Sequence, residues 1–208
     1  MNRRDAIGRV ALLMGGAVIG ADYFLSGCKP KGASDVGDLF TQDTTAYLNE
    51  IADTILPTTT SSPGAKAANV GTFMAVMVRD CYLPQDQKVF MEGLKKLDEA
   101  AQKQAGGKFM DLTPEKRTEV LVALDAEQKA YTAQRNKAVS VEVLKHKDDP
   151  DYQGPAMRNH YFRMMKELTL LGYFTSEIGA TKALRYVAVP GHYDGCIPYK
   201  KGDKAWAT

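Results

Sequence analysis

Residues 157–172 read MRNHYFRMMKELTLLG and contain a dense set of apolar side chains. These side chains recur at the three- and four-residue spacing that places them on one face of a helix. The set comprises Tyr161, Met164, Met165, Leu168 and Leu171. The spacing predicts a helix, and the apolar content predicts that this helix is the central one of the fold.

Shorter stripes with the same spacing predict helices N-terminal to this segment. Their apolar faces are Leu48, Ile51, Ala52, Ile55 and Leu56 within residues 47–56; Val70, Met74, Met77, Val78 and Cys81 ahead of Pro84; Phe90, Leu94, Leu97 and Ala101 within residues 85–104; and Val120, Leu121 and Leu124. No run alternates like a strand. The sequence therefore predicts an all-α fold, a single helical domain of about five or six helices with an irregular C-terminal tail.

Turn formers and caps set the expected boundaries of these helices. Pro57 ends the first helix, and Gly106-Gly107 follows the end of the third. Thr113-Pro114-Glu115 predicts a helix start, because the threonine hydroxyl can accept from a free amide and proline suits the first turn.

Four segments lack a clear stripe. Residues 58–69 contain many helix breakers and are interpreted as an ordered or partner-facing loop. Residues 134–150 are mostly polar, and we expect their end to be solvated. Residues 177–187 are a candidate short helix, and the tail beyond Pro190 is expected to lie over the body.

The N-terminus has the pattern of an export signal. Arg3-Arg4 precedes an apolar run over residues 10–21, which is too short to span a bilayer, and Leu25-Ser26-Gly27-Cys28 resembles a lipoprotein cleavage box. We interpret residues 1–27 as a twin-arginine signal, with an ordinary secretory signal as the alternative.

This interpretation divides the chain into three parts and predicts where the protein works. Residues 1–27 are the signal peptide, residues 28–40 are a flexible tether, and residues 41–208 are the helical domain. Lipid on Cys28 would tether the mature protein to a membrane on the periplasmic side of the bacterial envelope. The predicted localisation is therefore periplasmic and lipid-anchored, after twin-arginine export.

Two further cysteines remain, Cys81 and Cys196. In an oxidising compartment they favour a disulfide, which could contribute about 4 to 5 kcal/mol in the chain-entropy model. The alternative is that one of them pairs with a partner subunit.

Composition and motifs exclude several common functions. The formal net charge of +2 offers no electrostatic footprint for nucleic acid. Motifs for covalent haem, iron–sulfur clusters, dinucleotides and serine hydrolases are absent. His192, Asp194 and Cys196 alternate like ligands but are interpreted as a structured tail. We predict no catalytic, metal or cofactor site in this chain.

Several blocks of the sequence are similar to a known family. Residues 51–57 (IADTILP), 62–68 (SPGAKAA) and 172–180 (GYFTSEIGA), followed by Val-Pro-Gly at 189–191 and Gly-Cys at 195–196, resemble the gluconate 2-dehydrogenase subunit 3 family. The likeness extends over about residues 41–198.

The resemblance implies a small, non-catalytic subunit that partners a large flavin-dependent dehydrogenase of the glucose-methanol-choline type. FAD is then expected in the partner, with electrons passed to a cytochrome c or a quinone. Such small subunits commonly carry the twin-arginine signal and escort a partner that lacks one. The lipid anchor would make this subunit the membrane tether of the complex.

Physical grounds indicate where such a partner would make contact. An aromatic pair beside a breaker-rich loop favours contacts at Tyr173, Phe174, Thr175 and Glu177 and in the loop over residues 58–68. The alternatives are core packing for the aromatic residues and a plain surface connection for the loop.

Two other functions stay open from the sequence. One is a self-sufficient lipoprotein enzyme that acts on sugars or glycosides, with a site assembled from dispersed residues such as His160, His192 and Asp194. The other is a solitary binding or scaffold lipoprotein of the envelope.

Overall fold

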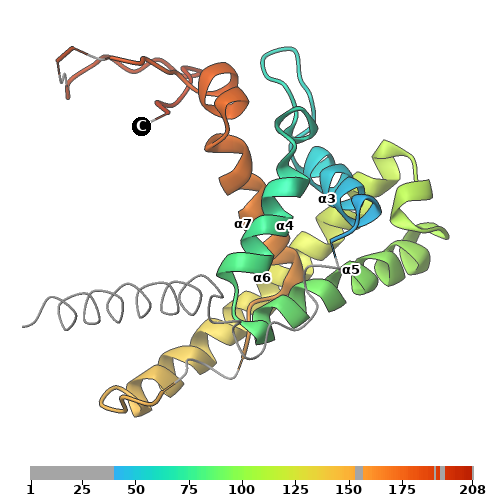
Figure 1. Cartoon of the computed structure of the whole chain (residues 1–208). Coiled ribbons are helices and arrows are strands. Elements are labelled where there is room, and N and C mark those ends of the chain that lie inside the picture. The colour runs from blue at the N-terminus through green and yellow to red at the C-terminus, as the bar shows by residue number, and fades with distance from the viewer. Residues whose placement is uncertain (1–39, 153–156, 190, 193–194, 208) are drawn as a thin grey trace, which may run out of the picture. The chain divides into compact units, whose positions relative to one another are not determined.

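Helix α7 (Tyr161–Phe174) lies at the centre of the fold, as its apolar sequence predicts. The computed structural model describes residues 40–152, 157–189, 191–192 and 195–207, which all belong to one compact unit. In this unit α7 packs against each of α3, α4, α5 and α6 (Figure 1). The apolar face of α7 therefore takes part in the core contacts of every other α-helix, although α3 and α4 also pack closely against each other.

The described residues are helical and contain no β-strand; Arg185 and Trp206 form an isolated bridge. The remaining elements are α3 (Gln42–Ile55), η1 (Ala65–Ala68), α4 (Val70–Cys81), α5 (Pro84–Ala105), η2 (Phe109–Asp111), α6 (Pro114–Lys145) and the π-helical turn η3 (Gly179–Ala183). This arrangement confirms the predicted all-α fold. The signal and tether, residues 1–39, lie outside the described residues.

The predicted core faces are largely confirmed, with two exceptions: Cys81 at the end of α4, which is exposed, and Leu171, whose position bears on function. The stripes on α5 and α6 are buried throughout, and Met164, Met165 and Leu168 of α7 are at most 3% exposed. Leu171 is 46% exposed, so its predicted burial is wrong. Gly172 and Tyr173 are buried next to it instead, because the buried face of α7 turns at this end towards α4 and η1.

The ends predicted for α3 and α5 are confirmed, but the cap predicted for α6 is wrong. Gly106 follows α5 with a positive φ of 79°, the left-handed conformation that glycine adopts freely. Thr113 occupies the cap position of α6, yet its hydroxyl accepts no bond from the helix amides. A hydrogen bond from its own backbone amide, and then one from the Thr113 hydroxyl, lower the pKa of Glu115, an acidic residue in the first turn of α6.

Two segments differ from the expected helix lengths. α6 continues through the polar stretch to Lys145, and only the turn after it, residues 146–150, is the predicted solvated end. The expected short helix over residues 177–187 is present over residues 177–183, where it continues into η3, and Leu184 that follows it has an extended backbone.

Close approach of α4 to its neighbours requires glycine at two crossings. A Cβ at Gly71 would lie 2.5 Å from the carbonyl oxygen of Thr45 in α3, and one at Gly172 would lie 2.5 Å from the ring of Phe73. The Gly71 amide also donates to Asn49 Oδ1 at 2.8 Å. These contacts fix α4 between α3 and α7.

Candidate partner-binding surface

Tyr173 joins the end of α7 to the loop between α3 and η1. Its hydroxyl lies 2.6 Å from Ser62 Oγ and donates to the carbonyl oxygen of Pro63. The loop is also closed on itself, because Thr58 Oγ1 accepts from the Gly64 amide at 3.0 Å. The structure thus brings together the loop and the aromatic pair that the sequence singles out, and it shows the loop to be ordered.

The four residues predicted to contact a partner differ in their exposure. Tyr173 is only 3% exposed, so it packs in the core, as the alternative interpretation held. Phe174, Thr175 and Glu177 are exposed at the end of α7. The ring of Phe174 meets that of Tyr173 edge-on at 5.2 Å, and the Thr175 hydroxyl donates to the Leu171 carbonyl at 2.7 Å. Phe174 and Glu177 therefore remain as surface side chains.

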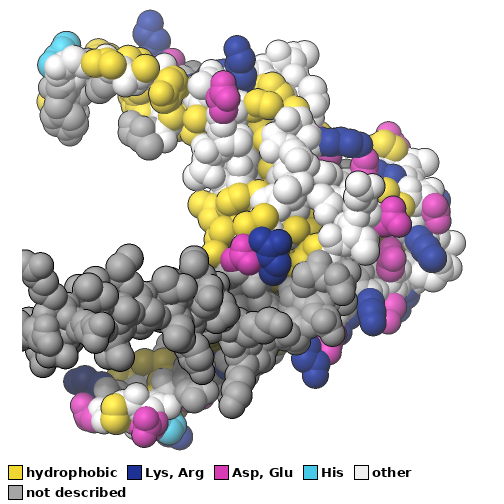
Figure 2. All heavy atoms as spheres, viewed as in Figure 1, with side chains coloured by type: hydrophobic (Ala, Val, Ile, Leu, Met, Phe, Trp, Pro, Cys, Tyr) yellow, Lys and Arg dark blue, Asp and Glu magenta, His cyan; other side chains and the backbone are white. Residues whose placement is uncertain are grey.

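Exposed apolar side chains extend from this end of α7 onto α4. Leu171 and Phe174 are 46% and 36% exposed, and Val76 of α4 is 41% exposed. Figure 2 shows hydrophobic side chains gathered over α4 and α7, on a face that is hollowed between these helices and the C-terminal residues. Such a gathering marks an interaction site more often than scattered single residues do.

The described residues after η3 form a second exposed feature, which we call the C-terminal arm (residues 184–189, 191–192 and 195–207). Its two ends are held together, since the Arg185 amide donates to the Ala205 carbonyl at 2.8 Å and the Ala207 amide to the Arg185 carbonyl at 2.9 Å. The Arg185 guanidinium lies 4.8 Å from the centre of the Trp206 ring. The arm is therefore a loop closed at its base.

The base of the arm is also attached to the body. Lys204 Nζ donates to the Lys182 carbonyl in η3 and lies 3.5 Å from the Ser61 carbonyl in the α3–η1 loop. Gly179 packs directly on the backbone of Tyr173, where a Cβ would overlap the carbonyl oxygen. The loop, the end of α7 and the arm thus meet at one end of the molecule.

The rest of the arm does not pack over the body, so that prediction is wrong. Residues 186–189, 191–192 and 195–206 are all exposed, including Val189 at 82% and Tyr199 at 78%. The other large apolar side chains exposed here are Tyr186, Val187, Ile197 and Trp206. Sequence analysis missed them as a candidate site; the signal was their interleaving with Lys200, Lys201 and Lys204.

The two cysteines predicted to form a disulfide both lie in the described part of the chain. Cys81 and Cys196 are both exposed, and no disulfide is present in the described part of the chain. Cys81 Sγ donates to Met77 Sδ at 3.9 Å. The disulfide therefore stays a prediction. Arg3, Arg4 and Cys28, the predicted export and lipidation residues, lie outside the described residues.

The histidines suggested for a dispersed catalytic site are not brought together. His160 begins α7, where its Nδ1 accepts from the Phe162 amide at 3.3 Å. Burial lowers the pKa of its ring below the ordinary value, although Glu127 at 3.5 Å opposes this, so the neutral ring serves as a cap. His192 lies on the arm beyond the other end of α7, and Asp194 is outside the described residues.

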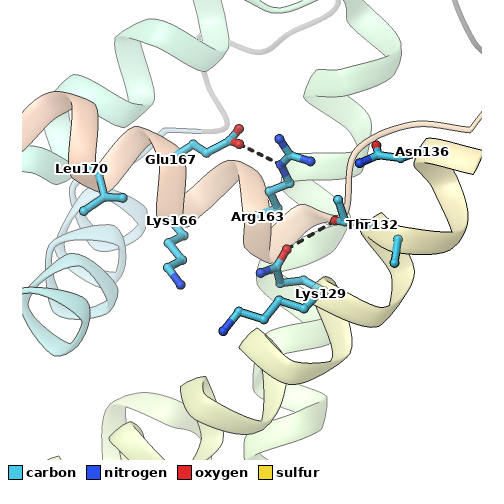
Figure 3. A pocket seen from close by; sticks show the side chains of 9 residues that line it. Lys129, Thr132, Asn136, Arg163, Lys166, Glu167 and Leu170 are labelled. Atoms are coloured by element: carbon cyan, nitrogen blue, oxygen red, sulfur yellow. Dashed lines mark hydrogen bonds and ion pairs between the residues drawn. The ribbon is translucent and has the colours of Figure 1, made fainter. Parts of the chain in front are cut away.

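A shallow groove of about 470 Å³ lies between α6 and α7 (Figure 3). The three cations along it are each paired: Lys129 and Lys166 lie 2.7 and 2.6 Å from the two oxygens of Asp125, and Arg163 lies 2.7 Å from Glu167. The Lys166–Asp125 pair connects α7 to α6, whereas each of the other two pairs lies within one helix. Because their charges are paired, these cations support packing rather than recognition of an anion.

Asp125 gives the fold a defined dependence on acid. Hydrogen bonds from Lys129 and then Lys166 hold the pKa of its carboxyl well below the ordinary value. Because the folded-state pKa is lowered, this stabilisation is complete above about pH 4 and is lost as the pH falls further. Both lysines are partly exposed, so we expect their ion pairs with Asp125 to contribute about 1 kcal/mol to the free energy of unfolding.

Urea denaturation checks this expectation. Asp125→Asn should lower the free energy of unfolding at pH 7 and have a smaller effect at pH 3, whereas the exposed Asp148→Asn should change little at either pH. Equal effects of Asp125→Asn at both pH values would contradict the assignment.

In the described part of the chain, no three His, Cys, Asp or Glu side chains gather to hold a metal ion. No helix among these residues combines the length and the apolar character needed to cross a membrane.

The fold and this surface define an all-α protein whose most distinctive exposed feature is an apolar end built from a loop, a helix end and a closed arm. A family model described as gluconate 2-dehydrogenase subunit 3 matches residues 42–191, and the chain belongs to that family. The family's name describes a subunit of a multi-subunit gluconate dehydrogenase complex. No curated protein and no solved structure gives a significant match.

Proposed function

We propose that this chain is a non-catalytic subunit that escorts a flavin-dependent dehydrogenase through twin-arginine export and holds it at the membrane. The partner is a sugar or gluconate dehydrogenase of the glucose-methanol-choline type that contains FAD. A cytochrome c subunit is a further candidate member of the complex. The observation that carries the proposal is the family match, which spans nearly all of the described helical body.

The N-terminal signal supports the escort role. Arg3-Arg4 and the short apolar run fit a route that moves folded cargo, and a flavoprotein must fold around its cofactor before it is exported. The cleavage box ending at Cys28 then provides a lipid anchor on the periplasmic side of the envelope. A partner without its own signal would need such a companion.

The surface at the end of α7 supports a binding role. Exposed apolar side chains on α4, α7 and the arm would be costly in a solitary soluble protein but are suited to a protein interface. The paired cations of the α6–α7 groove, in contrast, offer a small ligand little free charge. Association accounts for these features better than independent catalysis does.

Affinity purification from solubilised membranes tests the proposal. A tag at the C-terminal end of the full chain, expressed in its native host, should recover a larger protein with flavin absorbance, and haem absorbance if a cytochrome is present. Recovery of the chain alone from native membranes would refute the proposal. Sugar oxidation by the purified chain without a flavoprotein would favour the enzyme alternative.

A further inference from the structure

We propose that the C-terminal arm and the exposed apolar side of α7 form one docking surface for the flavoprotein, through a convex apolar area of that protein edged by carboxylates. This inference rests on the proposed function and adds where the partner binds and with what chemistry. It assigns the contact to Val189, Tyr199 and Phe174, with Lys200 and Lys201 at its edge.

The first argument is the exposure of side chains that the fold itself does not need. Val189 and Tyr199 are 82% and 78% exposed. An interface would remove this apolar area from water at a gain of about 25 cal/mol per Å². Burial against another molecule therefore explains residues that packing within the described chain does not.

The second argument is that the arm is held in place before binding. The cation–π contact between Arg185 and Trp206, which we call the Arg185–Trp206 clasp, closes the base of the arm. In addition, Arg185 Nη2 lies 3.8 Å from Asp203 Oδ2, and the Lys200 amide donates to the same oxygen at 2.9 Å. A loop that is already closed loses less conformational entropy on binding than a free tail would. The clasp thus presents the exposed side chains at a defined position beside α7.

The third argument is charge. Residues 184–207 contain four cations, Arg185, Lys200, Lys201 and Lys204, against the two carboxylates Asp194 and Asp203. Asp203 is engaged by Arg185 and the Lys200 amide, so the lysines form a basic edge to the apolar area. Complementarity predicts carboxylates on the partner.

Charge and shape also decide between occupants. A second copy of this chain docked arm to arm would place basic side chains against basic side chains, which is unfavourable. An anionic bilayer would match the charge, but a flat surface cannot fill the hollowed face between the arm and the helices (Figure 2). A folded protein with a convex surface satisfies both conditions.

The test uses the full chain in the complex recovered from membranes. Val189→Asp and Tyr199→Asp place charge at the centre of the proposed contact, at positions too exposed to affect folding. We expect each to lower the co-purified flavoprotein by about tenfold or more, as for residues central to an interface. Val122→Asp, at a site on α6 that is 64% exposed, is the matched control and should retain the partner.

A second variant tests the charge. Lys200→Glu with Lys201→Glu should weaken recovery of the partner at low salt and reduce the salt dependence of binding. The matched control is Lys95→Glu with Lys103→Glu, exposed on α5. Circular dichroism and thermal melting of each chain establish that the variants fold.

The outcomes separate this inference from the proposed function. If the wild-type chain recovers no flavoprotein, the proposed function fails. If the wild type recovers it and the arm variants recover it equally well, the docking surface is wrong. Binding of the unlipidated chain to vesicles of phosphatidylcholine with phosphatidylglycerol tests whether the surface contacts a bilayer. The proposal would be overturned if vesicle binding depended on Val189 and Tyr199 while recovery of the flavoprotein did not. Dimers of the wild-type chain that are absent from the arm variants would also overturn the proposal.

Discussion

Replacing Arg3 and Arg4 with lysine is expected to leave both this chain and its flavoprotein partner in the cytoplasm. Lysine keeps the positive charge but lacks the planar guanidinium with its fixed donors, so a receptor that reads the arginine pair should reject it. An ordinary secretory signal needs only the charge and should tolerate the change. The substitution therefore separates the two interpretations of the N-terminus. Fractionation with a flavin assay of the periplasm measures the result.

Two controls locate the effect in the arginine pair and in the anchor. Arg9→Lys makes the same chemical change outside the pair and should leave export intact. Cys28→Ala should permit export but release the complex from the membrane, because the thiol that accepts lipid is gone. Normal appearance of active flavoprotein in the periplasm without this chain would show that the partner does not depend on an escort.

The helices could be predicted from the sequence because each core-facing stripe repeats locally. The stripe of α7 identified the central element, and glycine and proline marked the ends of α3 and α5. The second half of α6 could not be predicted in this way, since Ala133 to Lys145 have almost no buried side. Its apolar side chains Val141, Val143 and Leu144 are themselves exposed, so they form no core-facing stripe, and continuation from a packed first half maintains the helix.

The candidate surface was only partly predictable. The aromatic pair and the breaker-rich loop were identified, but the bond from Tyr173 to Pro63 joins residues more than 100 positions apart and has no local signal. Leu171 fits the α7 stripe as well as Leu168 does, but it is exposed because the buried face of α7 turns at this end towards α4 and η1. The Arg185–Trp206 clasp likewise depends on the path of the intervening chain.

Replacing Gly93 with leucine is expected to destabilise the fold by about 3 kcal/mol, at the upper end of overpacking effects. Gly93 lies in the middle of α5, where it faces the first residue of α7. A Cβ there would lie 2.6 and 2.7 Å from Cγ and Cδ2 of Tyr161, whose side chain is only 6% exposed. The ring is enclosed, and burial raises the pKa of its hydroxyl to about 12. It cannot move aside without displacing α7.

The smaller substitution Gly93→Ala can raise or lower the free energy of unfolding, and the sign of that change decides between two physical effects. Helix propensity alone predicts a gain of about 1 kcal/mol, because alanine is favoured over glycine inside a helix. The overlap with Tyr161 predicts a net loss instead, since α5 and α7 must separate. Gly107→Ala is the matched control: its Cβ would make an ordinary 3.4 Å contact with Leu112, so no loss is expected. Urea denaturation measures the stability of both variants. A Gly93→Ala variant more stable than the wild type would show that α5 and α7 can separate at little cost. Because α7 carries both Tyr173 and the exposed Phe174, a crossing that resists separation is also what holds the candidate surface in position.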